Sequence, residues 1–272
     1  MPVDFQPSDI ELSIFQVDAF AEKVFQGNPA AVCPLDTWLP DAVLQAIAQE
    51  NNLSETAFFV KQTNGYALRW FTPVAEVRLC GHATLASAHV LFHHLQVEEE
   101  TLRFHTLSGE LKVQKQGEAL VMEFPADTPL PAEDPGFLNA ALGLDILDVV
   151  KGKDDLLVRV ASESDLEALQ PNFDWIRKLG CRGLIVTAKS ESTDFYSRCF
   201  FPNLGVEEDP VTGSAHTLLA PYWAGHLGKN AFYARQGGKR TGFLSCICQG
   251  DTVLLKGTAK TYLVGKIYYT FD

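Results

Sequence analysis

Two stretches of this 272-residue sequence follow one pattern, and they decide the fold. Residues 66–88 read YALRWFTPVAEVRLCGHATLASA, and residues 195–220 read FYSRCFFPNLGVEEDPVTGSAHTLLA. Both follow aromatic-x-x-Arg-x-Phe-x-Pro, then a loop, then Gly-x-Ala-x-x-x-x-Ala. An internal duplication gives two similar halves with a cleft between them. The polar residues that differ between the copies are therefore the first candidates for chemistry.

Length, composition and charge narrow the class of protein. With 46% hydrophobic residues, the chain can form two units of about 130 residues, each with its own core. The net charge is -12, and no run of Lys or Arg occurs. Because an acidic chain repels phosphate backbones, we expect no nucleic-acid partner. We expect no membrane span either, because no apolar run approaches the roughly 18 residues that one needs.

The N-terminal sequence and the cysteines point to the cytoplasm. The first residues, MPVDFQPSD, have neither the basic region nor the apolar region of a secretory signal. No Cys-x-x-Cys pair is present, so we expect reduced thiols and no metal site. The six cysteines are scattered at irregular spacing: Cys33, Cys80, Cys181, Cys199, Cys246 and Cys248.

Hydrophobic patterns predict the same order of elements in each half. The first half should contain strands at 13–20, 55–61 and 67–71, a helix after Pro40, and a long apolar helix over 82–95. The second half should contain a helix at 171–179, strands at 183–188 and 196–200, and an apolar helix opened by Gly213. Pro221 should end or kink that last helix. A helix that is apolar on nearly all sides is buried.

The predicted fold class is α+β, with each half a curved layer of strands wrapped around one buried central helix. Strands occur in adjacent pairs and not one per helix, which argues against a doubly wound sheet. Four prolines fall within residues 125–135, so this segment should be the linker between the halves. Residues 251–271 have the pattern of closing strands.

Gly81 and Gly213 each open a central helix. A helix N-terminus has unpaired N–H groups and about half a positive charge. Two such ends facing one cleft would bind a small anion, each contributing roughly 0.3–2 kcal/mol to a carboxylate. This pairing favours a small substrate that carries a carboxylate. The alternative is that both glycines serve only tight turns.

Six short motifs together resemble the PhzF-like phenazine-biosynthesis family, within the diaminopimelate-epimerase-like superfamily. They occur in order along nearly the whole chain. The motifs are VDAF at 17–20, F-x-GNPA at 25–30, SETAF at 54–58, R-x-F-x-P at 69–73, CGHAT at 80–84 and EDPVTG at 208–213.

The resemblance implies two pseudo-symmetric domains, each a β-barrel-like sheet around a central helix, with the active site between them. It implies that the last strand returns to the first domain. The domains would then be 1–122 with 260–272, and 123–259. The resemblance further implies a homodimer, and an enzyme that uses no cofactor and no metal.

The resemblance also assigns roles to residues. Some members of the superfamily use one cysteine at each helix start. Cys80 matches the first of these, but Pro210 stands at the second position and cannot carry a proton. PhzF-like members use a single glutamate instead, which here is Glu55. Residues that match substrate-binding positions are His82, Asp209 and Ser214, and we expect Gly81 and Gly213 to shape the cleft with them.

A single carboxylate can remove and return a proton if burial brings its pKa towards neutrality. Glu55 precedes an apolar strand, so partial burial is expected; without the resemblance it would be interpreted as a surface or capping residue. His82 should be neutral, because the positive end of the helix disfavours the imidazolium. Asp209 could hold Glu55, His82 or a substrate ammonium group. Asn28 is interpreted first as a turn residue, and the alternative is that it orients the substrate from the first turn.

The sequence therefore predicts a cofactor-independent isomerase that moves a proton on a small carboxylate, with Glu55 as the acid and base. Two alternatives remain open. Cys80 could be the base of a single-thiol epimerase, since a helix start lowers the pKa of a thiol. The chain could also bind metabolites or protein partners without catalysis, because a fold does not determine a function.

Overall fold

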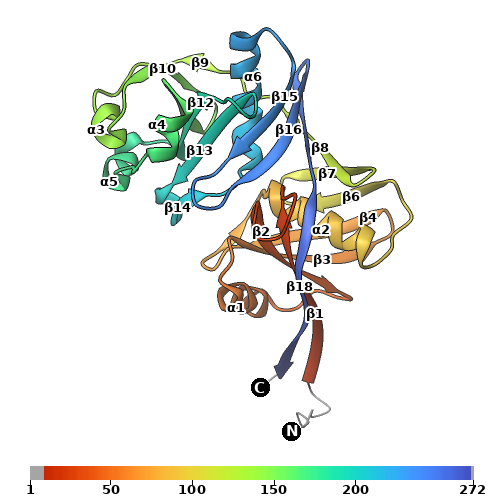
Figure 1. Cartoon of the computed structure of the whole chain (residues 1–272). Helices are drawn as coiled ribbons and strands as arrows, with labels where there is room; N and C mark the ends of the chain where they lie inside the picture. The colour runs from red at the N-terminus through yellow and green to blue at the C-terminus, as the bar shows by residue number, and fades with distance from the viewer. Residues whose placement is uncertain (1–8, 271–272) are drawn as a thin grey trace.

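A computed structural model describes residues 9–270 and shows two similar halves, one above the other in Figure 1. Each half contains one long buried helix, α2 (Gly81–His93) in the lower half and α6 (Gly213–Leu227) in the upper half. Every residue from 82 to 92 is buried. The predicted central helices and the α+β class are confirmed.

The strands and shorter helices follow the predicted order. The first half contains β1 (Asp9–Ala19), β2 (Asn28–Leu35), α1 (Asp41–Asn51), β3 (Glu55–Gln62), β4 (Gly65–Phe71), β5 (Glu76–Val77), β6 (Thr101–Thr106), β7 (Gly109–Gln116) and β8 (Ala119–Pro125). The rest of the chain contains β9 (Leu130–Pro131), α3 (Leu138–Leu142), β10 (Ile146–Lys151), β11 (Asp155–Val160), α4 (Glu163–Ala168), α5 (Phe173–Ile176), η1 (Arg177–Leu179), β12 (Gly183–Lys189), β13 (Phe195–Phe201), η2 (Pro202–Leu204), β14 (Val206–Asp209), β15 (Ala231–Gln236), β16 (Gly242–Gln249), β17 (Thr252–Gly257) and β18 (Ala259–Thr270).

Strand pairing repeats between the halves. In the first half β2 and β3 are parallel, β3 and β4 antiparallel, β4 and β6 parallel, and β6, β7 and β8 antiparallel. In the second half β11, β12, β13, β15, β16 and β17 pair in the same alternation. An antiparallel pair of β8 with β17 joins the halves into one continuous sheet.

The last strand, β18, pairs antiparallel with β1, so both ends of the described chain lie in the first half (Figure 1). The predicted limit between residues 122 and 123 falls inside β8. The residue limits of the domains therefore stay a prediction, whereas the pairing of the last strand with the first is part of the observed topology.

Each copy of the repeat contains an arginine that binds a short strand, and this strand precedes the central helix in the chain. Arg69 in β4 makes two hydrogen bonds of 2.7 Å to the carboxylate of Glu76 in β5. Arg198 in β13 binds Glu208 in β14 in the same way, at 2.7 and 2.8 Å. These paired contacts fix the loops that lead into α2 and α6, which explains why the pattern is repeated.

Pro221 does not end α6, which continues to Leu227. Proline has no N–H, so it leaves the carbonyl of the residue four positions earlier without its helical partner. That residue is Thr217, and its carbonyl accepts a hydrogen bond of 3.0 Å from the N–H of Asp127. Of the two expected effects, an end or a kink, the end does not occur, because a neighbouring segment supplies the missing donor.

The proline-rich segment 125–135 connects the halves but is not wholly irregular. It contains β9, in which Pro131 pairs with Val150 at the edge of the sheet. Proline is tolerated at an edge because its missing N–H can face away from the neighbouring strand. The segment is therefore a linker that includes one short edge strand.

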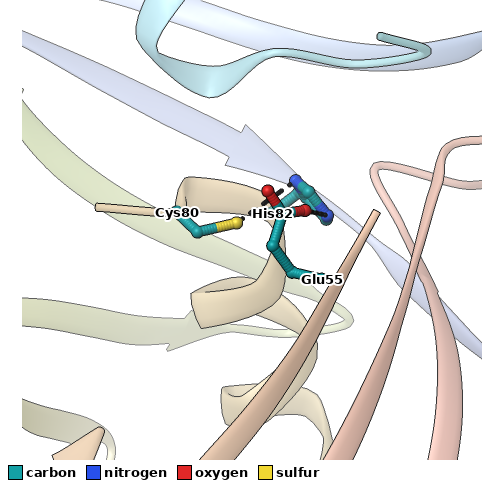
Figure 2. A group of neighbouring side chains, drawn as sticks. All are labelled: Glu55, Cys80 and His82. Atoms are coloured by element: carbon teal, nitrogen blue, oxygen red, sulfur yellow. Dashed lines mark hydrogen bonds and ion pairs between the residues drawn. The ribbon is translucent and has the colours of Figure 1, made fainter. Parts of the chain in front are cut away.

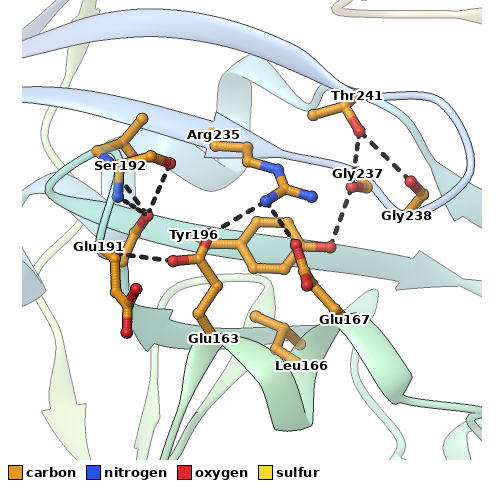
Figure 3. A network of polar contacts seen from close by, with 12 residues as sticks. Glu163, Leu166, Glu167, Glu191, Ser192, Tyr196, Arg235, Gly237, Gly238 and Thr241 are labelled. Carbon is orange, nitrogen blue, oxygen red and sulfur yellow. Dashed lines mark hydrogen bonds and ion pairs between the residues drawn. The ribbon is translucent and has the colours of Figure 1, made fainter.

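A polar network connects α4, β13 and β15 in the second half (Figure 3). Arg235 in β15 binds Glu163 and Glu167 of α4 at 3.0 and 2.7 Å, and its guanidinium lies 4.3 Å from the centre of the Tyr196 ring. The Tyr196 hydroxyl donates to the carbonyl of Gly237. The network thereby holds α4 and the loop after β15 against β13.

The loop after β15 also connects the two halves through hydrogen bonds. Arg240 donates to the carbonyl of Gly27 at 2.7 Å and to the Asp18 carboxylate at 2.6 Å. Gly27 has φ +66°, and a β-carbon there would lie 2.0 Å from the carbonyl oxygen of Ala19. Glycine is therefore required at this turn, which places the next residue, Asn28, at the junction of the halves. Within residues 9–270 no helix has the length and apolarity to cross a membrane.

We expect Arg198→Ala to lower the free energy of unfolding by about 3–5 kcal/mol, because it leaves Glu208 without its buried partner. Arg103→Ala is the control, since the Arg103–Glu110 pair is largely exposed and should contribute within about 1 kcal/mol. Urea unfolding of both variants measures the difference. Equal losses in the two variants would contradict this assignment.

Candidate active site

A cleft of about 580 Å³ lies between the halves, at the starts of α2 and α6. A β-carbon on Gly81 would lie 3.7 Å from the Cα atom of Gly213, so the two helix starts are in close contact. All six predicted site residues line this cleft: Glu55, Gly81, His82, Asp209, Gly213 and Ser214. Their individual roles stay predictions.

Glu55 is the first residue of β3, and it faces the first turn of α2 (Figure 2). Its Oε2 atom lies 3.1 Å from Nε2 of His82, and 17% of its side chain is exposed. Neither of these two atoms has another hydrogen-bond partner among the described residues. The partial burial expected for Glu55 is confirmed, and its carboxylate is accessible from the cleft.

His82 lies between Glu55 and Cys80 (Figure 2), with Nδ1 3.5 Å from the Cys80 sulfur. Burial of the ring opposes protonation, but the negative charge of the Glu55 carboxylate and the hydrogen bonds to Cys80 and Glu55 favour it, and the pKa of His82 is raised well above its ordinary value. The expectation of a neutral imidazole considered the helix start alone, whereas the adjacent carboxylate favours the imidazolium.

Asn28, for which the sequence favoured a turn role, contacts two of the predicted site residues. Its side chain is fully buried, and Nδ2 donates to Asp209 Oδ1 at 2.7 Å and to the carbonyl of Val211 at 3.0 Å. The same nitrogen lies 3.2 Å from Nδ1 of His82. Asn28 thus joins the halves inside the site. Its place directly after the turn glycine was the available signal, but burial of its side chain was not visible in the sequence.

Asp209 ends β14 and is held by several donors. Besides Asn28, the Thr212 hydroxyl donates to its carboxylate, and Gln236 donates to its main-chain carbonyl at 2.9 Å. Burial raises the pKa of Asp209 from 3.8 to about 6; the Glu55 charge adds to the rise, and His82, Thr212 and Asn28 oppose it. Asp209 can therefore change its protonation state close to neutral pH.

The second half places a cation one position before the equivalent of Glu55, which is Gly183. Phe58 pairs with Arg69 and Val186 pairs with Arg198, and this register aligns Arg182 with Ser54, directly beside Glu55. Arg182 lines the cleft and donates to the Ser214 hydroxyl at 3.1 Å. The sequence analysis did not identify Arg182. The repeat itself was the signal that could have identified Arg182.

Glu55, Cys80 and His82 are the group in the cleft that could hold a metal ion, since their ligand atoms lie within 4.8 Å of one another. However, His82 turns Nδ1 towards Cys80 and Nε2 towards Glu55 (Figure 2). One ion cannot bind all three residues unless the His82 ring reorients. The arrangement fits a chain of hydrogen-bonding groups better than a preformed metal site.

Comparison with known proteins identifies the family. The model of phenazine biosynthesis-like proteins, PhzC-PhzF, matches residues 17–265. The chain belongs to this family. An uncharacterized isomerase of Pseudomonas aeruginosa is 56% identical over 95% of this chain and 100% of its own length. Another from Halalkalibacterium halodurans is 49% identical, covering 92% of this chain and 96% of its own.

Solved structures agree with this membership. A PhzF-family crystal structure from Enterococcus faecalis superposes with a TM-score of 0.93 at 47% identity, covering 96% of this chain and 100% of that one. A hydroxyproline epimerase from Agrobacterium vitis shares the fold at a TM-score of 0.59 and 11% identity, covering 96% of this chain and 93% of its own. The chain is thus a PhzF-family isomerase with the epimerase-like fold.

We expect the assigned side-chain carboxyl carbon of Asp209 in this PhzF-family protein to titrate in NMR with a pKa near 6 instead of 3.8. Glu55→Gln should lower this pKa, because it removes a neighbouring negative charge. Glu50→Gln, at an exposed position of α1, should leave it unchanged. Because the folded-state pKa exceeds the unfolded value, the contribution of Asp209 to stability should fall as the pH rises from about 4 to about 6. A titration near 4 would contradict the burial argument.

Proposed function

We propose that this isomerase needs no cofactor and moves a proton on a small metabolite that carries a carboxylate, with Glu55 as the single acid and base. The proposal rests on the contact between Glu55 and His82, whose Oε2 and Nε2 atoms lie 3.1 Å apart. Both residues line the cleft beside the N-termini of α2 and α6. The second half offers no carboxylate at the equivalent position, which favours one base over two.

Each part of the cleft has a task in such a reaction. Glu55 removes a proton from carbon, and the electron pair delocalises towards the substrate carboxylate or a conjugated double bond. The N–H groups at the starts of α2 and α6 stabilise the negative charge that develops there. Protonated Glu55 then returns the proton to the same carbon or to another. His82 holds the carboxyl group of Glu55 in position through both steps.

The single-thiol alternative has less support. Burial, together with the Glu55 charge, raises the pKa of Cys80 to about 11, so the sulfur is a neutral thiol at neutral pH. A neutral thiol is a poor base and a poor nucleophile. The non-catalytic alternative differs from ours in one observable, since a binding protein would not exchange protons at carbon.

The deciding experiment follows deuterium uptake by NMR in deuterated buffer. Pooled carboxylates, including amino and hydroxy acids with a carbon–carbon double bond, are incubated with wild-type protein and with Glu55→Gln. We expect exchange at carbon with the wild type and a rate about 10²–10⁴-fold lower with Glu55→Gln. Full exchange by a folded Glu55→Gln variant would exclude Glu55 as the base.

Two further variants test the alternatives in the same assay. Glu50→Gln is the matched control for loss of a carboxylate, and it should exchange at the wild-type rate. Cys80→Ser should also keep most of its rate if the thiol is a packing residue. Loss of exchange in Cys80→Ser, with retention in Glu55→Gln, would instead establish the single-thiol mechanism.

Gly213→Ala separates a ligand role of the helix start from a structural one. Its β-carbon would meet Leu255 at 3.6 Å and Gly81 at 3.8 Å, which are ordinary contacts, so thermal stability should be unchanged or slightly higher. Exchange should fall at least about tenfold, because the methyl group displaces the substrate. Gly225→Ala, in open space on the same helix, is the control. Normal exchange by Gly213→Ala would favour the tight-turn interpretation.

A further inference from the structure

We infer that Arg182 binds the carboxylate group of the substrate and so determines which way the substrate lies in the cleft. This inference rests on the proposed function, because it takes a carboxylate-bearing substrate as its starting point. It adds a specificity-determining residue from the second half and a polarity for the bound molecule. Three observations support it: the contacts that fix the guanidinium, the N–H and O–H donors that remain unpaired, and the charges of the residues that line the cleft.

The guanidinium of Arg182 is fixed before any ligand arrives. Its Nε atom donates to Asp155 Oδ1 at 2.8 Å, and Nη2 donates to the other carboxylate oxygen of Asp155. Nη2 also donates to the Ser214 hydroxyl at 3.1 Å. The ring of Phe201 lies 5.4 Å from the guanidinium carbon. A side chain held on three sides loses little conformational entropy when it binds a ligand.

Two donors remain for a ligand at this position. None of the hydrogen bonds found among residues 9–270 uses Nη1 of Arg182, which has two N–H groups. The Ser214 hydroxyl accepts its bond from Arg182, so its own proton is available to donate. Arg182 and Ser214 both line the cleft. A guanidinium N–H and a hydroxyl side by side match the two oxygens of a carboxylate.

The charges along the cleft favour one orientation. Glu55 and Asp209 line the cleft and would repel a second carboxylate placed beside them. His82 lies on the same side, but its positive charge is already paired with Glu55. Arg182 is the one Arg or Lys among the lining residues, whereas its partner Asp155 is buried behind it with 5% exposure. The substrate carboxylate therefore lies at Arg182 and Ser214, and the reacting carbon lies towards Glu55 and His82.

Much of the remaining lining is apolar, and it belongs to both halves. Val77 and Phe124 come from the first half, and Phe201, Leu204 and Val206 come from the second. A flat, partly apolar carboxylate such as 2-aminobenzoate fits this lining. Its amide, 2-aminobenzamide, has nearly the same shape and no charge, so the pair isolates the contribution of the carboxylate charge.

Calorimetry with these two probes tests the inference without any turnover. Wild-type protein should bind 2-aminobenzoate more tightly than 2-aminobenzamide. Arg182→Gln should weaken 2-aminobenzoate binding about 10- to 100-fold and leave 2-aminobenzamide binding nearly unchanged, because one charge-assisted contact is lost. Glu55→Gln should keep the preference for the carboxylate even though it stops proton exchange, so failure of the catalytic proposal and failure of this one give different results.

Three variants keep the test decisive if Arg182→Gln is unstable. Arg182→Lys retains the charge and should keep part of the preference. The double variant Asp155→Asn with Arg182→Gln removes the buried carboxylate that the single change would leave unpaired, and it should still lack the preference. Arg177→Gln, at an exposed arginine paired with Asp174, controls for loss of a positive charge and should behave as the wild type.

The inference is overturned by any of three results. Wild-type protein could bind 2-aminobenzoate no better than 2-aminobenzamide. Arg182→Gln could weaken both probes to the same degree, which would identify Arg182 as a structural link between Asp155 and Ser214. The double variant could recover the wild-type preference, which would show that the guanidinium is not needed to recognise the carboxylate.

Discussion

The structure depends on the contact between the starts of its two buried helices, at Gly81 and Gly213. Two positive helix ends are brought together there, which is unfavourable unless anionic groups or a ligand lie nearby. The surrounding sheet forces this approach, because the pairing of β8 with β17 joins the two layers that enclose the helices. Glu55 and Asp209 lie close to the same point, and they supply negative charge in the protein without a ligand. The chemistry of the cleft is therefore tied to the packing of the fold.

Duplication supplied two equivalent positions at this contact, and the two copies have diverged in charge. The first half carries an acid beside an imidazole, Glu55 with His82, and the second half carries a cation beside a hydroxyl, Arg182 with Ser214. Two identical halves would give a symmetric site, suited to a pair of like groups acting on opposite faces of one carbon. A site with one acid wall and one cationic wall instead distinguishes the two ends of its ligand. Differences at three pairs of equivalent positions (54 with 182, 55 with 183 and 82 with 214) are enough for this, because the backbone of both halves is retained.

Most of the fold could be predicted from the sequence, because its signals are local. The repeated pattern, the apolar runs and the glycines at the helix starts identified both central helices and the strands beside them. What failed depended on partners distant in the chain. The donor from Asp127 that satisfies the helix around Pro221 lies some ninety residues away. Likewise, the site motifs gave the correct positions, but the protonation of His82 and the burial of Asn28 depend on neighbours that only the folded chain brings together.

The return of β18 to β1 has a consequence for the order in which the protein is completed. During synthesis the N-terminal strand is made first, yet its antiparallel partner is the last described strand to leave the ribosome. The second half is built from a continuous stretch of chain and can pair most of its strands earlier. The first half must therefore wait, with β1 exposed along one edge, until β18 has been made. A chain that stops before residue 259 would lack the closing strand of the half that carries Glu55.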